Sequence, residues 1–171
     1  FALTECDLSN WQNTGNFSGD SLGMLSGLTK ATNINLTGWD TSGFTNAQSF
    51  FTDCGKLTGG CTVTAPNLDW SSTDTMKSMF YRSCLLTTTD LSNWTLRTAG
   101  VSLEDFFFEA GQTSAPTFTA VSTPDLSTWN NTSGLRSLKE FAYNAFALKS
   151  VNLTGWDTSN VTNMFEGFKG A

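Results

Sequence analysis

The fold is decided by the stretch Val151-Asn152-Leu153-Thr154-Gly155-Trp156-Asp157-Thr158-Ser159-Asn160-Val161-Thr162-Asn163-Met164. Residues 35–42, Asn-Leu-Thr-Gly-Trp-Asp-Thr-Ser, repeat its first half around Trp39, and shorter copies surround the other tryptophans. Every tryptophan belongs to this series: Trp11, Trp39, Trp70, Trp94, Trp129 and Trp156. A repeated unit of this length predicts a solenoid, because one unit cannot bury its apolar face without stacking on its neighbours.

Before each tryptophan the hydrophobic pattern has a period of two. Val151 and Leu153 are apolar and Asn152 between them is polar, and Ile34, Asn35 and Leu36 repeat this order. Such alternation predicts a short strand with one buried face. Stacking one strand per coil would give a parallel sheet with a spacing of about 4.8 Å.

After each tryptophan the pattern changes to the spacing i, i+3, i+7. It is seen in Val161, Met164 and Phe168, and again in Phe44, Ala47 and Phe51. This spacing predicts a short helix, and hydroxyl residues just before it, such as Thr158 and Ser159, are suitable N-caps. In the third copy Phe80 lies only ten residues after Trp70, which we interpret as a two-residue deletion at residues 71–73.

The chain resembles the BspA-like branch of the leucine-rich-repeat proteins. Trp156 to Met164 follows the Trp-Asp-Thr-Ser-Asn-Val-Thr-x-Met signature of that branch, and residues 50–57 and 79–81 match the second half of its unit. The resemblance implies an extracellular, non-enzymatic protein of bacterial, protist or viral surfaces, with a role in adhesion or ligand binding. It brings no catalytic residues to carry over.

The predicted fold is therefore an α/β repeat: a leucine-rich-repeat solenoid of about six coils, each with one short parallel strand and one short helical segment. A single domain covers residues 1–171, with coils near 5–31, 32–61, 62–86, 87–121, 122–148 and 149–171. Residues 109–116 of the fourth coil are rich in turn formers and are expected to project as a surface loop. The expected structural ladder consists of Leu8, Leu36, Leu91, Leu126 and Leu153 with Trp11, Trp39, Trp94, Trp129 and Trp156.

The composition excludes several classes of partner. Only 14% of residues are charged, and 9 Lys and Arg against 15 Asp and Glu give a net charge of −6. Without a basic stripe, binding to nucleic acid is not expected. No apolar run approaches the roughly 20 residues that span a bilayer, so we expect no membrane insertion by this segment. The chain opens at Phe1 without a signal peptide and is expected to be part of a longer extracellular protein.

Four cysteines fit disulfides in an oxidising compartment, and their even number leaves three connectivities open. Cys54 and Cys84 follow aromatic pairs in consecutive coils, at a stacking distance that a disulfide can bridge. We predict oxidised cysteines, with Cys54, Cys61 and Cys84 the participants and Cys6 buried. The alternative is a set of buried thiols.

Three further features are candidate binding sites. Phe106, Phe107 and Phe108 cannot all point inward from one helix face, so one of them is a candidate surface contact. Asn35 and Asn152 are candidate glycosylation sites, because both lie in sequons and at outward strand positions. The outward strand positions form a polar file that could bind a ligand or only keep the sheet soluble. Its members are Asp7, Asn35, Asn67, Asp90, Asp125 and Asn152, beside Ser9, Thr37, Ser92, Ser127 and Thr154.

An enzyme is not expected. Histidine, the commonest general base, is absent, and the carboxylate pairs Glu104–Asp105 and Asp69–Asp74 have no recognisable cleft in the sequence. We expect no cofactor and no metal ion. The favoured function is extracellular surface recognition or adhesion toward a protein or glycan ligand. The alternative is a structural subunit of an extracellular filament or coat, in which copies of the solenoid stack end to end.

Overall fold

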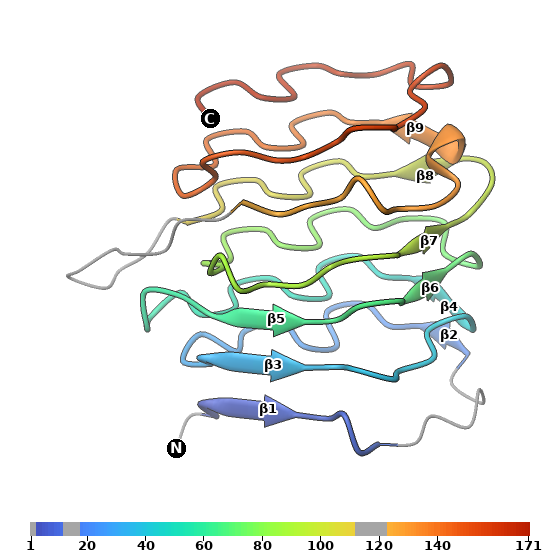
Figure 1. Cartoon of the computed structure of the whole chain (residues 1–171). Helices are drawn as coiled ribbons and strands as arrows, with labels where there is room; N and C mark the ends of the chain where they lie inside the picture. The colour runs from blue at the N-terminus through green and yellow to red at the C-terminus, as the bar shows by residue number, and fades with distance from the viewer. Residues whose placement is uncertain (1–2, 12–17, 112–122) are drawn as a thin grey trace.

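The computed structural model describes residues 3–11, 18–111 and 123–171, and it is a solenoid of parallel strands (Figure 1). Strands β1 (Glu5–Asp7), β3 (Asn33–Asn35) and β5 (Thr62–Thr64) form one parallel sheet. Cys6 pairs with Ile34, and Ile34 pairs with Val63, so the alternating apolar residues are stacked in register. Regular strand structure therefore covers about three turns of the solenoid.

Parallel pairing continues outside this sheet in short pieces. Three further pairs are each parallel: β2 (Gly19–Asp20) with β4 (Phe44–Asn46), β6 (Asp69–Trp70) with β7 (Thr95–Leu96), and β8 (Val101–Ser102) with β9 (Leu135–Ser137). Isolated parallel bridges join Thr64 to Asp90 and Asp125 to Asn152. The chain thus climbs in one direction from the N-terminus to the C-terminus, as Figure 1 shows.

The expected helical segments are wrong. Within the described residues the structure has one helix, the three-residue 3₁₀ helix η1 (Thr132–Gly134), and neither 44–51 nor 161–168 is helical. In their place the chain forms consecutive β-turns that stack from coil to coil. We call these stacked turns the turn wall; it comprises residues 20–27, 46–54, 75–83, 102–110, 137–145 and 163–171. In Figure 1 it is the wavy side of the solenoid, away from β1, β3 and β5.

The turn wall depends on a left-handed residue at every fourth position. Ser49 and Asp53 both have φ 59°, and Ser78 and Arg82 have φ 56° and 52°. Backbone N–H groups of the turn wall therefore form two kinds of hydrogen bond. The N–H of Thr52 donates to the carbonyl of Ser49 within the same turn, whereas the N–H of Ser49 donates to the carbonyl of Lys77 in the next coil (2.9 Å). No helix can contain such residues, because its φ values are uniformly near −60°.

The helix prediction failed because the two structures bury nearly the same residues. A four-residue turn period places Ala47 and Phe51 on one face, where both are fully buried, and this spacing is close to the 3.6-residue period of a helix. Periodicity alone does not separate the two. The distinguishing signal is polar or glycine residues four apart, such as Gly23 and Gly27, at which a left-handed backbone is tolerated.

The tryptophans form a column whose indole N–H groups bind the coil below. Trp39 Nε1 donates to the carbonyl of Leu8 (3.0 Å), and Trp94 Nε1 donates to that of Ala65 (2.6 Å). Trp129 and Trp156 do the same to Leu91 and Leu126, both at 2.8 Å. Ring stacking adds to these bonds, with 4.9 Å between the Trp94 and Trp129 centroids. Each of these four indole N–H groups therefore ties its coil to the coil below.

The two-residue deletion predicted after Trp70 is wrong, because Trp70 is not the structural equivalent of the other tryptophans. Trp70 pairs with Leu96, two residues beyond Trp94, whereas Leu68 lies opposite Trp94 and accepts the N–H of Thr95. Leu68 therefore occupies the tryptophan position. Phe80 follows Leu68 by twelve residues, the same interval as in the other coils, so no deletion exists at residues 71–73.

The expected ladder residues line the core beside this column. Leu36, Leu91 and Leu126 are buried, and Leu8 and Leu153 are partly buried and pack against the same core. Trp39, Trp94 and Trp129 are also buried, while Trp11 is 55% exposed. Buried residues thus form one continuous core along the solenoid.

Candidate functional site

Outward polar residues of the strand side form an ordered row. Asx turns hold them, because each carboxylate or amide oxygen accepts the backbone N–H two residues ahead. The Oδ1 of Asp90 accepts from Ser92 N (3.0 Å), and the Oδ1 of Asn35 accepts from Thr37 N (3.1 Å) and Oγ1 (2.7 Å). The same bonds occur at Asp7, Asp125 and Asn152. We call these five residues together with Thr64 the strand-side row.

The assignment of Asn67 to the polar file is wrong. Thr64 pairs with Asn35 and with Asp90, so Thr64 holds the third position of the row. Asn67 lies three residues later, in a turn with φ 60°, and its Oδ1 accepts from the Asn93 amide (3.0 Å). The incorrect alignment of Trp70 caused this error, because Asn67 was placed relative to that tryptophan.

The strand-side row is negatively charged at neutral pH. Hydrogen bonds from Ser9 lower the pKa of Asp7, and hydrogen bonds from Ser127 lower the pKa of Asp125. The amides of Asn35 and Asn152 also lower these two pKa values through hydrogen bonds between adjacent coils. The carboxylates therefore stay ionised, and the row favours neutral or cationic partners over anionic ones.

The turn wall carries a ladder of charges that alternates in sign between coils. Lys77 lies 3.7 Å from Glu104, and Lys139 Nζ donates to Glu104 Oε1 at 2.9 Å. These lysines, Lys139 first, lower the pKa of Glu104. Burial raises the pKa of the neighbouring Asp105 to about 6, helped by a hydrogen bond with Glu140. Both carboxylates of the Glu104–Asp105 pair are thus engaged in ion pairs between coils.

The second carboxylate pair is also used structurally. Asp74 forms an ion pair with Arg97, and Asp69 Oδ1 accepts the N–H of Ser71 (2.8 Å). Neither the pair Asp69–Asp74 nor the pair Glu104–Asp105 lines the hollow described below. Glycosidic chemistry would need two carboxyl groups facing each other across a substrate cleft.

Of the three consecutive phenylalanines, two are buried. Phe106 is 0% and Phe107 is 1% exposed, and Phe108 is partly exposed. Phe108 lies in an aromatic stack with Tyr81 (5.2 Å) and Tyr143 (5.0 Å). Cations cover both ends of this stack, with Arg82 above the Tyr81 ring and Lys169 above the Tyr143 ring. Stacked rings and cations therefore lie against the faces of these three aromatic side chains.

All four cysteines are buried and gather in the first three coils. Cys84 N donates to the carbonyl of Cys54 (2.9 Å), and Cys61 N donates to the carbonyl of Cys84 (2.7 Å), so these three backbones are adjacent. Burial raises the pKa of the Cys61 thiol to about 12 and also raises that of Cys54. A disulfide among Cys54, Cys61 and Cys84 stays a prediction.

The candidate glycosylation sites differ in exposure. Asn35 is half-buried within β3, while Asn152 is exposed. In each, the side-chain oxygen accepts the hydroxyl of the sequon threonine, Thr37 or Thr154, at 2.7 Å. The expected surface loop at 109–116 lies largely outside the described residues, from residue 112 onward.

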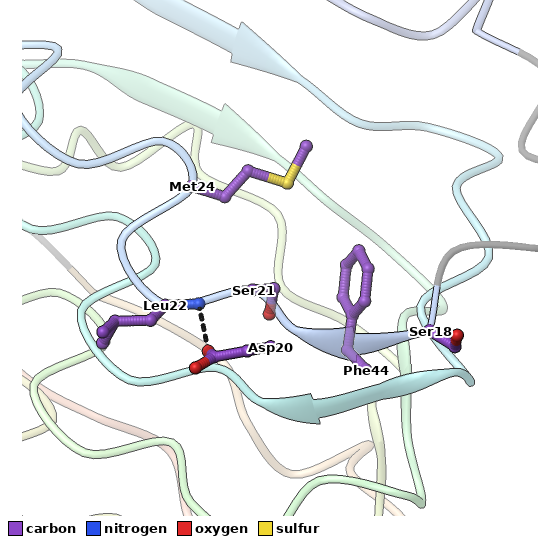
Figure 2. Close-up of a pocket in the computed structure, with 6 residues that line it drawn as sticks. All are labelled: Ser18, Asp20, Ser21, Leu22, Met24 and Phe44. Atoms are coloured by element: carbon purple, nitrogen blue, oxygen red, sulfur yellow. Dashed lines mark hydrogen bonds between the residues drawn. The ribbon is translucent and has the colours of Figure 1, made fainter.

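A hollow of about 310 Å³ opens beside β2, at the first segment of the turn wall. It is lined by Ser18, Asp20, Ser21, Leu22, Met24 and Phe44. In Figure 2 the side chains of Met24 and Phe44 point toward the same space, and Asp20 accepts the N–H of Leu22 (2.8 Å). No sequence pattern indicates this hollow, because its shape depends on where two coils lie relative to each other.

No three His, Cys, Asp or Glu residues in the described part of the chain are arranged to hold a metal ion. Across residues 3–11, 18–111 and 123–171, no helix has the length and apolar character needed to cross a bilayer.

Comparison with known proteins identifies a family. The sequence model of the family described as "Mycoplasma protein of unknown function, DUF285" matches residues 6–120 and 115–171. The chain belongs to the DUF285 family. No curated protein and no solved structure matches the chain.

The two DUF285 matches extend over the whole solenoid. Together they include the three-stranded sheet, the tryptophan column and most of the turn wall. The repeat recognised from the tryptophans therefore lies within the residues that the DUF285 model matches.

Proposed function

We propose that this DUF285 chain is a non-enzymatic recognition module of an extracellular surface. The observation that carries the proposal is the strand-side row, which presents fixed polar groups at regular intervals on a rigid sheet. Because its side chains are already held by Asx turns, binding would cost little additional side-chain entropy. Its ionised aspartates favour a neutral glycan or a basic protein surface as the ligand.

The finer assignment to the BspA-like leucine-rich-repeat branch, with six coils, belongs to the same proposal. It is supported by a second row linked through parallel pairing on the turn wall: Asp20, Asn46, Thr75, Ser102, Ser137 and Asn163. An extracellular location is supported by the neutral polar composition and by the even number of cysteines.

Ligand binding on the strand side is testable with an array of immobilised glycans and extracellular-matrix proteins. We expect concentration-dependent binding that falls at least tenfold in a Thr37→Arg/Ser92→Arg double variant, because bulky cations would cover the row. Gln48→Arg on the turn wall is the matched control and should bind as the unaltered chain does. Absence of binding across the array, or equal loss in the control, would contradict the proposal.

Assembly by end-to-end stacking is the second candidate function, and one observation favours it. Phe168 and Met164 occupy positions of the turn wall that are buried elsewhere, yet they are 44% and 54% exposed. Apolar surface of this kind is stabilised when it is covered by a further coil, either of the same chain or of a second copy.

A further inference from the structure

The ion pairs of the described chain lie away from the strand-side row. They involve lysines and arginines of the turn wall, of the return just after it and of the corner after the tryptophans: Lys56, Lys77, Arg82, Arg97, Lys139 and Lys169. By contrast, Asp7, Asp90 and Asp125 of the row form no ion pair with any described residue. Because paired charges largely cancel, the row presents uncompensated negative charge on a chain whose net charge is −6.

The carboxylates of the row stand in one line along the solenoid. Asp7 pairs with Asn35, and Asn35 pairs with Thr64. Thr64 is bridged in turn to Asp90, so Asp90 lies three coils beyond Asp7. In Figure 1 the strands that end at the first three of these residues, β1, β3 and β5, lie one above another.

Another carboxylate follows in the next coil. Thr95 and Asn130 are bridged, and each lies five residues after an aspartate of the row, Asp90 or Asp125. Asp125 is therefore one coil beyond Asp90 and four coils beyond the first aspartate. The position after Asp125 is held by Asn152, so the acidic part of the row ends at Asp125.

The spacing of these carboxylates matches an extended peptide that runs along the solenoid. At about 4.8 Å per coil, Asp90 and Asp125 lie about 14 Å and about 19 Å from Asp7. In an extended chain that rises about 3.3 Å per residue, residues four and six positions apart are separated by about 13 Å and about 20 Å and point to the same side. Basic residues with the spacing Lys-x-x-x-Lys-x-Lys would therefore each meet one carboxylate.

Each carboxylate can accept a hydrogen bond from such a ligand. The Asx turn at Asp90 uses Oδ1 for the N–H of Ser92 (3.0 Å), whereas a carboxylate has about four lone-pair sites. Bonds from an ammonium or guanidinium group to a carboxylate belong to the stronger class of hydrogen bonds. The row itself consists of aspartate, asparagine and threonine, so a neutral glycan would find no aromatic ring on it to stack against.

We propose that the strand-side row binds an extended basic segment of a partner protein, which lies along the solenoid with its Lys or Arg side chains on Asp7, Asp90 and Asp125. The segment crosses the strands, so recognition depends on the spacing of its side chains and not on pairing with a sheet edge. This inference rests on the proposed recognition function and names the class of its ligand.

Two peptides of equal composition test the spacing. The isotope-labelled chain is titrated by nuclear magnetic resonance with capped Lys-Ser-Ser-Ser-Lys-Ser-Lys and with capped Lys-Lys-Lys-Ser-Ser-Ser-Ser. We expect the first peptide to shift the amide signals of the strand side and to bind at least threefold more tightly than the second. Raising the salt from about 0.01 M to about 1 M shortens the screening length from about 30 Å to about 3 Å and should abolish this binding.

A double variant of the same shape removes only the charge. Asn35 forms the same Asx turn in the row as Asp90, so Asp90→Asn/Asp125→Asn should keep the fold and weaken binding of the first peptide at least tenfold. Asp69→Asn is the matched control. Asp69 forms an Asx turn with Ser71 in β6, outside the row, so this variant should bind as the unaltered chain does.

The outcomes separate the inference from the function beneath it. Equal affinity for the two peptides, or undiminished binding by the double variant, would overturn the inference. Strand-side shifts with cellohexaose, a neutral glucan, that persist at high salt and in the double variant would show that the row recognises glycans, which overturns the basic ligand but leaves the recognition function. Absence of shifts with either peptide overturns the inference, and absence of binding across the ligand array as well overturns both.

Discussion

At the scale of single residues, the indole N–H groups connect the repeat to its stability. In four coils a tryptophan donates to a backbone carbonyl of the coil below, that of Leu8, Ala65, Leu91 or Leu126. Trp70, displaced by two residues from that column, has an indole nitrogen without a partner in the described structure, although its ring is fully buried. The two kinds of tryptophan therefore contribute the same burial but different hydrogen bonding.

Trp94→Phe and Trp70→Phe measure that difference. Trp94→Phe leaves the buried carbonyl of Ala65 unpaired, which costs about 1–3 kcal/mol beyond the lost ring volume. Trp70→Phe removes a similar volume without breaking a bond, so its loss should be smaller by about that amount. Urea unfolding followed by fluorescence gives both values. Equal losses would show that the indole bonds do not stabilise the column.

Asp105 is expected to destabilise the folded chain at neutral pH. Its pKa is raised to about 6 from an ordinary value of 3.8, chiefly by burial, so the folded state holds this proton more tightly than the unfolded state. That contribution is present below about pH 4 and is lost as the pH rises through about 6. Asp105→Asn should raise the melting temperature at pH 7.5 and change it little at pH 4.

Asparagine also suits the left-handed backbone at Asp105, where φ is 56°, so the substitution adds no strain. The control is Glu104→Gln. Lys139 holds the pKa of Glu104 below its ordinary value, so this variant should lose stability at pH 7.5. A lower melting temperature for Asp105→Asn at pH 7.5 would contradict the assignment.

At the scale of elements, the strands could be predicted from the sequence and the turns could not. Alternation around Ile34 identified strand β3, because period two has no close competitor. The positions of Phe44, Ala47 and Phe51 suited a helix and a chain of turns equally well. What decides between them is backbone strain at residues such as Ser49, which hydrophobic periodicity does not report.

Glycine substitutions on the turn wall distinguish turns from a helix, because the two structures predict stability changes of opposite sign at Ser49. Ser49→Gly relieves a left-handed serine and should stabilise the chain by up to about 1 kcal/mol. The neighbouring Gln48 is not left-handed, and Gln48→Gly should cost about 0.5–1 kcal/mol. In a helix both variants would destabilise. A loss of stability in Ser49→Gly on urea unfolding would therefore count against the turn wall.

The leucine ladder is the other element that sequence reasoning could place. Leu91 is 3% exposed, and Leu91→Ala should cost about 2–5 kcal/mol because a core cavity remains. Leu57→Ala removes the same atoms from a side chain that is 46% exposed and should stay within about 0.5 kcal/mol. Calorimetric melting of both variants checks the prediction, and similar melting temperatures would refute the ladder.

At the scale of the whole molecule, function-bearing features follow from how coils stack. The sequence predicted the polar file on the strand side, because outward positions follow from alternation. It could not reveal the hollow at Met24 or the displacement of Trp70. Each of these depends on the register between coils, which Thr64 and Leu68 set without matching the repeat signature.

The helix-free turn wall is the structural feature on which the other conclusions depend most. Its most direct test is nuclear magnetic resonance of the folded chain, with backbone dihedrals from three-bond couplings and chemical shifts. We expect positive φ at four-residue intervals, near 59° at Ser49 and Asp53 and near 51° at Glu140. Negative φ near −60° throughout residues 46–54 and 137–145 would show helices there and contradict the account.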